Sequence, residues 1–83
     1  MEFIIYLLVD ENSQTTYVGY SDDIKRRIKE HKRGIVKTTR NFGKFRCFSL
    51  EKINNVTEAR KREKYWKSAA GRKKLKEYFN KIK

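Results

Sequence analysis

The stretch Phe3–Val9 reads FIIYLLV and consists entirely of apolar and aromatic residues, most of which favour β-strands. A polar stretch, residues 10–14, separates it from Thr15–Tyr20, TTYVGY, which is again rich in β-branched and aromatic residues. This order of strand, polar stretch and strand predicts a β-hairpin.

A helix is predicted directly after the hairpin. Residues 21–23, Ser-Asp-Asp, supply an N-cap and a negatively charged first turn, and a helical pattern opens at Ile24 and runs to Arg33. Gly34 then ends it. We therefore predict a helix from about residue 22 to residue 33.

A third strand is predicted in the second half of the chain. Residues 35–43 have no sustained period and carry the basic sequence KTTR, so we expect a loop there. Residues 44–53 have the composition of a strand. Asn55 or Thr57 can cap a second helix, which we expect to run to about Ala69.

A last helix is indicated by apolar spacing. We expect Gly71 to break the second helix. The apolar residues after it recur at i, i+3, i+4 and i+7, and they are Leu75, Tyr78, Phe79 and Ile82. The predicted order is ββαβαα, an α+β fold in which a small three-stranded sheet is flanked by about three helices.

Length and charge narrow the class of protein. The 83 residues suffice for one small core, so we expect a single domain over residues 1–83. Cys47 has no second cysteine to pair with, and no apolar run approaches the ~20 residues of a membrane helix, so we expect a soluble, cytoplasmic protein. A net charge of +12 indicates a polyanionic partner, nucleic acid before an anionic membrane, and hence association with the nucleoid.

The positive charge is concentrated near the end of the chain. Residues 1–57 hold 11 basic and 7 acidic side chains, whereas residues 58–83 hold 11 and 3. We therefore expect the last two helices to form the strongest electrostatic contact surface for nucleic acid.

Three polar side chains stand at helix positions that the pattern assigns to the core. Arg27 and His31 share a face with two isoleucines, and Glu63 lies beside Trp66 in the second helix. The ordinary explanations are an arginine that reaches solvent, a histidine that caps the helix end, and a glutamate paired with Lys67 or Arg27. The alternative is a functional site, because a carboxylate on a packed face is costly unless it is paired or binds a metal ion.

The hairpin adds two tyrosines. If the numbers of cross-strand partners sum to 23 or 25, Tyr6 and Tyr17 point to the same face of the sheet, whereas a sum of 24 separates them. Two tyrosines in strands are usually packing residues. Gly19, two residues beyond Tyr17, leaves a gap on that face that a backbone or a phosphate could approach.

Taken together, these residues resemble the motifs of the GIY-YIG nuclease family over nearly the whole chain. The first motif matches Ile4–Tyr6, with isoleucine in place of the family's first glycine, and the second matches Tyr17–Gly19. The family's arginine matches Arg27, with His31 one helical turn later, and its acidic residue on the next helix matches Glu63. The chain is most similar to the small, single-domain bacterial members.

The resemblance implies a metal-dependent endonuclease that hydrolyses phosphodiester bonds in DNA, with Tyr6, Tyr17, Arg27, His31 and Glu63 as its site. It implies that Glu63 holds one divalent ion, Mg²⁺ or Mn²⁺, and that Arg27 binds the phosphate. It also implies that Tyr17 or Tyr6 is the general base, with its pKa lowered from about 10 by Arg27 and the metal, and that His31 bonds the phosphate or a tyrosine.

The expected partner is duplex or branched DNA, and no membrane is expected as a partner. Cleavage would be directed by DNA structure or by a protein partner, in repair, recombination or processing. Flanking phosphates would be bound at Gly19 and by basic residues outside the motifs, which are Lys37, Arg40, Lys61, Lys64, Arg72, Lys73 and Lys74. The alternative is a non-catalytic nucleic-acid-binding module on the same fold, which would not require Glu63.

Overall fold

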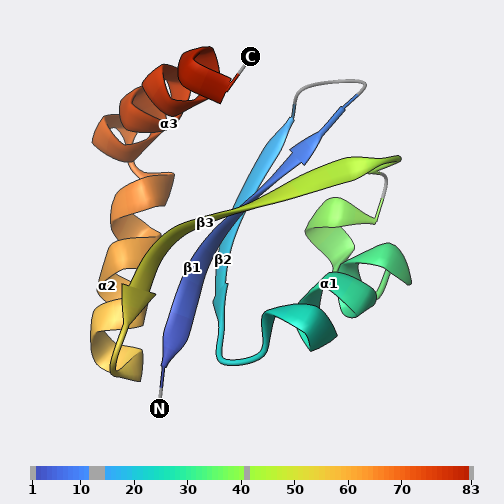
Figure 1. The fold of residues 1–83 in the computed structure, drawn as a ribbon, viewed down its shortest axis with the longest axis horizontal. Helices are drawn as coiled ribbons and strands as arrows, with labels where there is room; N and C mark the ends of the chain where they lie inside the picture. The colour runs from blue at the N-terminus through green and yellow to red at the C-terminus, as the bar shows by residue number, and fades with distance from the viewer. Residues whose placement is uncertain (1, 12–14, 41, 83) are drawn as a thin grey trace.

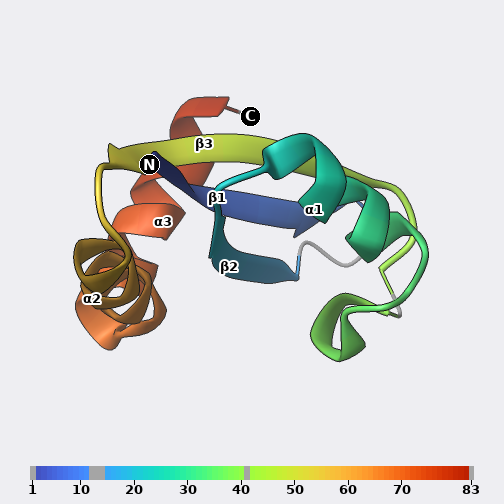
Figure 2. The ribbon, with the colours of Figure 1, turned by 90° about the horizontal axis from the view of Figure 1, so that it is seen from below.

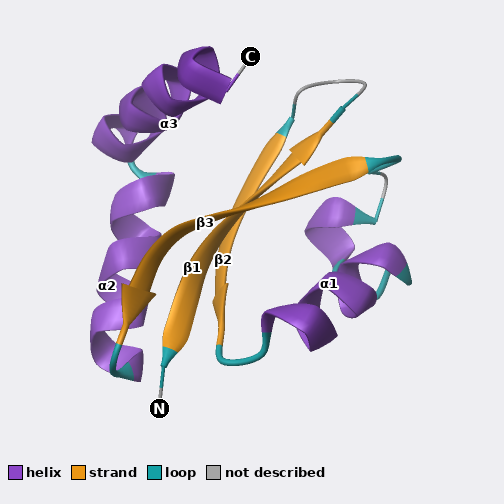
Figure 3. Ribbon diagram, viewed as in Figure 1, coloured by secondary structure: helices purple, strands orange, loops and turns teal. Residues whose placement is uncertain are grey.

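The structure is a computed structural model that describes residues 2–11, 15–40 and 42–82, and the side chains of these residues except 38 and 78–82. Its strands and helices follow the predicted order ββαβαα, and the fold is α+β (Figures 1 and 3). A short 3₁₀ helix is added between the first helix and the third strand.

Three strands form one antiparallel sheet in the order β2-β1-β3. They are β1 (Phe3–Asp10), β2 (Thr16–Ser21) and β3 (Phe45–Ile53). The central strand is β1, which explains its continuous apolar sequence, because both of its faces are covered. Tyr6 pairs with Gly19 and Leu8 with Tyr17, so the partner numbers sum to 25 and the two tyrosines share a face.

The helices cover opposite faces of this sheet (Figures 1 and 2). Helix α1 (Ile24–Lys32) lies on one side, and α2 (Val56–Lys67) and α3 (Ala69–Ile82) lie on the other. Alternate residues of β1 and β2 pack against α2 and α3 in the main core, which comprises Ile5, Leu7, Val9, Val18, Ala59, Trp66 and Leu75. The other face of β1 carries the buried side chains of Tyr6 and Leu8.

The start of α1 differs from the prediction. Ser21 still belongs to β2, and the N-cap is Asp23, whose side chain accepts a hydrogen bond from the Arg26 backbone N–H at 3.1 Å. Both aspartates therefore precede the helix, and its first turn contains no acidic residue. The end of the helix is as predicted, because Gly34 follows with φ of 76°, a conformation that glycine adopts readily.

The junction of α2 and α3 also differs from the prediction. Asn55 caps α2, since its side chain accepts from the Glu58 backbone N–H at 2.8 Å. The break falls at Ser68, whose backbone is extended, and Gly71 lies inside α3. A Cβ on Gly71 would overlap the backbone of Tyr65 and Trp66, so a glycine is required there by the close approach of the two helices.

The loop after α1 and the last helix can also be compared with their predictions. The predicted loop after α1 contains the 3₁₀ helix η1 (Lys37–Thr39), and the Thr39 side chain is 1% exposed. Leu75 is buried on the apolar face of α3, whereas the side chains of Tyr78, Phe79 and Ile82 lie outside the described part of the chain. Within the described residues, none of the helices combines the length and the apolar character that crossing a membrane demands.

Candidate active site

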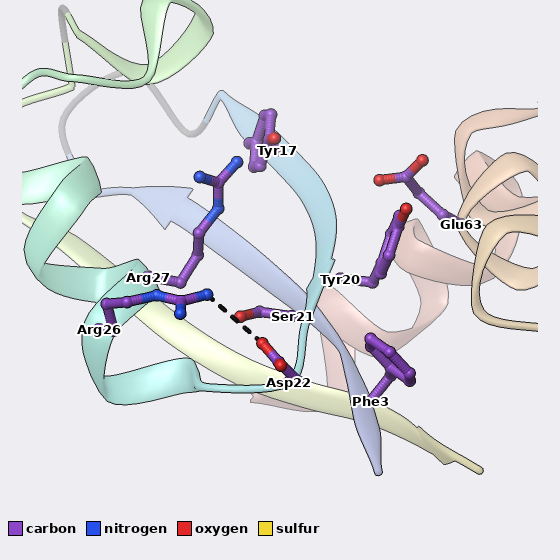
Figure 4. A pocket seen from close by; sticks show the side chains of 8 residues that line it. All are labelled: Phe3, Tyr17, Tyr20, Ser21, Asp22, Arg26, Arg27 and Glu63. Atoms are coloured by element: carbon purple, nitrogen blue, oxygen red, sulfur yellow. Dashed lines mark hydrogen bonds and ion pairs between the residues drawn. The ribbon is translucent and has the colours of Figure 1, made fainter. Parts of the chain in front are cut away.

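A pocket of about 330 Å³ opens around the exposed edge of β2. It is lined by residues from both faces of the sheet, namely Phe3, Tyr17, Tyr20, Ser21, Asp22, Arg26, Arg27 and Glu63. Because β2 is an edge strand, Arg27 reaches the pocket from α1 on one side and Glu63 reaches it from α2 on the other (Figure 4). The pocket thus brings together three predicted site residues, Tyr17, Arg27 and Glu63.

Tyr6 and His31 lie behind this pocket and do not line it. Their exposed fractions are 1% and 3%. The Tyr6 hydroxyl accepts a hydrogen bond from Arg27 Nε at 3.2 Å and is 2.9 Å from His31 Nε2. The Tyr17 and His31 rings meet edge to face, with centroids 5.1 Å apart. Tyr6 and His31 therefore support the side chains that face the pocket.

Burial has the largest effect on the pKa of Tyr6. Burial raises the pKa of its phenol to about 12, and the hydrogen bond from Arg27 offsets only part of that increase. Arg27 alone therefore does not lower the pKa of Tyr6 below its ordinary value, because the loss of hydration outweighs the nearby cation. Tyr17 is half-buried and has access to the pocket.

His31 bonds a tyrosine, which is one of the two partners predicted for it. Its other ring nitrogen, Nδ1, is 2.6 Å from Thr39 Oγ1, and Thr39 donates its own proton to the Val36 carbonyl at 3.5 Å. We assign the ring proton to Nδ1, which faces Thr39, because the Tyr6 hydroxyl already accepts from Arg27 and can donate to His31 Nε2. Burial and the charge of Arg27 lower the pKa of His31, so the imidazole is neutral at neutral pH.

Three supporting residues were missed from the sequence. Thr39 follows no periodic pattern, and nothing in the sequence marks it. Glu30 accepts from Arg27 Nη1 at 3.0 Å, and the i,i+3 spacing of this pair could have indicated it. Glu51 on β3 accepts from two side chains of α2, Arg62 Nε at 2.8 Å and Trp66 Nε1 at 2.7 Å.

Glu63 is partly accessible and has a basic neighbour. Its side chain is 24% exposed, and Oε2 lies 3.7 Å from Lys67 Nζ, the i,i+4 pair named among the ordinary explanations. The same ammonium group lies 5.5 Å from the centroid of the Tyr17 ring. No group of three or more His, Cys, Asp and Glu side chains that could hold a metal ion occurs in the described residues.

The residues predicted to contact flanking DNA are not gathered at this pocket. Arg72 lines a second, adjacent pocket, and Arg40 donates to the Gly34 carbonyl at 3.1 Å. Lys61 lies 3.7 Å from Glu58 in an exposed pair. The remaining four side chains are exposed, and they are Lys37, Lys64, Lys73 and Lys74.

The gap predicted beside Gly19 is closed. A Cβ on Gly19 would lie 2.6 Å from the Tyr6 hydroxyl oxygen and 3.0 Å from the Tyr17 ring. The tyrosine rings therefore fill the space where we expected a phosphate or a backbone to approach, and Gly19 is buried.

A basic α+β protein whose edge pocket joins a tyrosine, an arginine and a glutamate has the groups expected of a phosphodiester-cleaving domain. The family profile of the GIY-YIG catalytic domain matches residues 2–77, and the chain therefore belongs to the GIY-YIG family. Membership implies a nuclease-type function with DNA as the substrate, and GIY-YIG nucleases generally use divalent metal ions. Searches of curated proteins and of solved structures gave no significant match.

Proposed function

We propose that this protein is a metal-dependent DNA endonuclease, directed by DNA structure, which hydrolyses a phosphodiester bond at the β2-edge pocket. The observation that carries the proposal is that Arg27 and Glu63, from helices on opposite faces of the sheet, line one pocket together with Tyr17. Phosphodiester hydrolysis needs a proton acceptor, a cation for the phosphate and a site for a metal ion at the leaving oxygen. A protein that only binds a phosphate does not need the carboxylate of Glu63.

Arg27 is assigned to the phosphate. Its Nε is held by the Tyr6 hydroxyl and its Nη1 by Glu30, and the N–H donors of the guanidinium that are not engaged by Tyr6, Glu30 or Tyr17 would bind phosphate oxygens. The hydrogen bond to Tyr6 also raises the pKa of Arg27, which keeps it charged. Two fixed contacts orient the guanidinium before substrate binds, so little rearrangement is needed during the reaction.

Tyr17 is assigned as the general base. Tyr17 lines the pocket, whereas the Tyr6 hydroxyl is buried and is occupied by His31 and Arg27. Of these two tyrosines, Tyr17 is the one that faces the pocket, so it would accept the proton of a water molecule as that water attacks the phosphate.

The residues present fit a single Mg²⁺ or Mn²⁺ ion at Glu63. Mg²⁺ keeps several of its waters and is usually held by one or two carboxylates together with substrate phosphate. Glu63 supplies such a carboxylate and already attracts a cation, Lys67 Nζ at 3.7 Å. Asp22 also lines the pocket, but it pairs with Arg26 at 3.4 Å. Bound there, the ion would neutralise charge on the phosphate and the leaving oxygen.

The Glu63–Lys67 pair also favours a second candidate, a non-catalytic DNA-binding module. In that case the lysine alone would satisfy the carboxylate, and no metal ion would be required. The two candidate functions predict different effects of removing the Glu63 charge. An endonuclease should lose cleavage, whereas a DNA-binding module has no cleavage to lose.

The test compares wild type with Glu63→Gln and Arg27→Ala on supercoiled plasmid and on flapped or branched duplexes with Mg²⁺ or Mn²⁺. For an endonuclease, each substitution lowers the cleavage rate by about 100-fold or more, and Glu63→Gln keeps its affinity for DNA. Glu58→Gln is the matched control, because Glu58 is an exposed acid of the same helix paired with Lys61. If wild type and Glu63→Gln bind DNA equally and neither cleaves any substrate, the DNA-binding module is correct.

A second readout tests the metal site without cleavage. Mn²⁺ is paramagnetic, so binding at Glu63 should broaden the NMR signals of residues around the pocket in wild type. The same titration of Glu63→Gln should leave those signals sharp, and equal broadening in both proteins would place the ion elsewhere.

A further inference from the structure

A second pocket of about 240 Å³ lies next to the first along the edge of β2. It is lined by residues of β2, α2 and α3, which are Thr16, Tyr17, Val18, Trp66, Lys67, Arg72 and Leu75. Tyr17 lines both pockets, so its ring stands between them. The second pocket therefore adjoins the first at Tyr17.

Part of the wall of the second pocket is apolar and aromatic, and the rest is polar. Val18, Trp66 and Leu75 belong to the main core, and each reaches this pocket with its outer surface. Tyr17 adds a half-buried ring. A bare phosphate is poorly matched to such walls, whereas a nucleobase has flat π-faces that stack on aromatic side chains irrespective of sequence.

Two cationic side chains, Lys67 and Arg72, also line the pocket, and they differ in their contacts with other side chains. Lys67 lies within ion-pair distance of Glu63 and over the ring of Tyr17. The Arg72 guanidinium is exposed and has no side-chain partner among the residues that the structure describes. An arginine that is free beside an apolar hollow suits a ligand with a flat base and a negatively charged phosphate.

We propose that this second pocket binds one unpaired nucleotide of the substrate strand, next to the cleaved phosphate, with its base in the hollow and its phosphate on Arg72. A base within a duplex is stacked and paired, and it could enter only after leaving the helix. The pocket would thus select DNA that is single-stranded or flapped beside the cleavage site. This inference rests on the proposed function, since it uses the same strand that the first pocket would cleave.

The first test changes only the DNA, and binding is measured with Glu63→Gln so that the substrate stays intact. Two flapped oligonucleotides of the same sequence are compared, one complete and one lacking the base of the unpaired nucleotide next to the cleavage site. We expect the missing base to weaken binding by about 5- to 100-fold, the range of base–aromatic stacking. Removal of a base several positions along the flap is the control and should leave affinity unchanged.

The second test changes the pocket. Thr16 is exposed at its rim, so Thr16→Trp should obstruct the hollow and abolish the preference for the complete flap over the flap that lacks the base. Arg72→Gln should weaken binding of both flaps by a similar factor. Lys76→Gln is the matched control, because Lys76 is an exposed cation of the same helix that does not line the pocket.

Two results would overturn the inference. Equal affinity for the complete flap and the flap without the base would show that the pocket holds only a phosphate. A preference that survives Thr16→Trp would place the base elsewhere. Both results leave cleavage by wild type untouched, so they are distinct from failure of the proposed function, in which wild type cleaves no substrate.

Discussion

The Tyr6 hydroxyl occupies the space that a side chain on Gly19 would need, since a Cβ there would lie 2.6 Å from the hydroxyl oxygen. These two residues face each other across β1 and β2. Tyr6 is held in place by His31 and Arg27, so its ring cannot turn aside without breaking both contacts. The glycine of the second motif is thus required by the tyrosine of the first.

Gly19→Ala should therefore destabilise the protein. We expect a loss of about 1–3 kcal/mol in the free energy of unfolding, the usual cost of overpacking a filled core, measured by urea denaturation. In a double-mutant cycle with Tyr6→Phe, the two losses should sum to more than the loss in the double variant, because the hydroxyl is the nearest obstacle. Full additivity would show that the Tyr6 hydroxyl is not what excludes a side chain at residue 19.

Substitution of Tyr17 should mainly reduce the cleavage rate, whereas substitution of Tyr6 should mainly reduce stability. Tyr17→Phe should lower the cleavage rate by about 100- to 10,000-fold, the range for a general base. Tyr6→Phe should mainly lower the free energy of unfolding, by about 1–3 kcal/mol, because it leaves buried partners unsatisfied. Cleavage rates and urea denaturation are measured for both variants. If Tyr6→Phe stays stable and loses more cleavage than Tyr17→Phe, the base is Tyr6.

Thr39 should set the tautomer of His31. In Thr39→Val the ring loses the acceptor at Nδ1, so the proton should move to Nε2, where it would point at the Tyr6 oxygen. The chemical shifts of the two imidazole nitrogens report this exchange directly by ¹⁵N NMR. Thr39→Ser keeps the hydroxyl and should retain the wild-type tautomer. Identical shifts in all three proteins would remove Thr39 from any role in orienting His31.

The protein should lose stability on mild acidification because of His31. Burial and the charge of Arg27 lower the pKa of His31 below 6.5, with a smaller opposing effect from Glu30. Between the lowered pKa and 6.5 the unfolded chain binds a proton that the folded protein excludes, so the free energy of unfolding rises with pH in this window. The slope for one proton is at most about 1.4 kcal/mol per pH unit.

Urea denaturation above and below pH 6.5 measures this slope. His31→Gln removes the titrating group, so the variant should be less stable than wild type at neutral pH and should lack the slope. A slope of equal size in the variant would assign the pH dependence to another group.

The sequence predicted the fold well because its signals are local. The apolar run of β1, the cap at Asn55 and Gly34 at the end of α1 each act within a few residues, and each has the predicted effect. The errors arose where two elements meet. Gly71 reads as a helix breaker, but it is required by the contact of α3 with α2, which no local rule contains.

The candidate site was predictable in part for the same reason. Helix periodicity placed Arg27 and His31 on the packed face, whereas the sequence left the hairpin register open, and the structure has the register that brings Tyr6 and Tyr17 together. The burial of Tyr6, which raises its pKa in spite of the nearby Arg27, depends on packing between α1 and the sheet. Thr39 lies in a segment without periodicity, so its contact with His31 could come only from the structure.

Glu51 should fix the orientation of the helix that carries Glu63. Its carboxylate accepts from Arg62 and Trp66, which lie on either side of Glu63 in α2. Although burial opposes it, these two hydrogen bonds lower the pKa of Glu51 below 4.5. Glu51→Gln should therefore lower the free energy of unfolding at neutral pH by about 1–3 kcal/mol.

The pH dependence of that loss identifies its cause. A lowered carboxyl pKa contributes stability that is present above pH 4.5 and disappears as the pH falls through the lowered value, so wild type and Glu51→Gln should converge in strong acid. Urea denaturation across this range makes the comparison, with Glu58→Gln as an exposed control on α2. A difference between wild type and Glu51→Gln that persists unchanged in acid would mean that packing, rather than the charged hydrogen bonds to Arg62 and Trp66, holds α2 against β3.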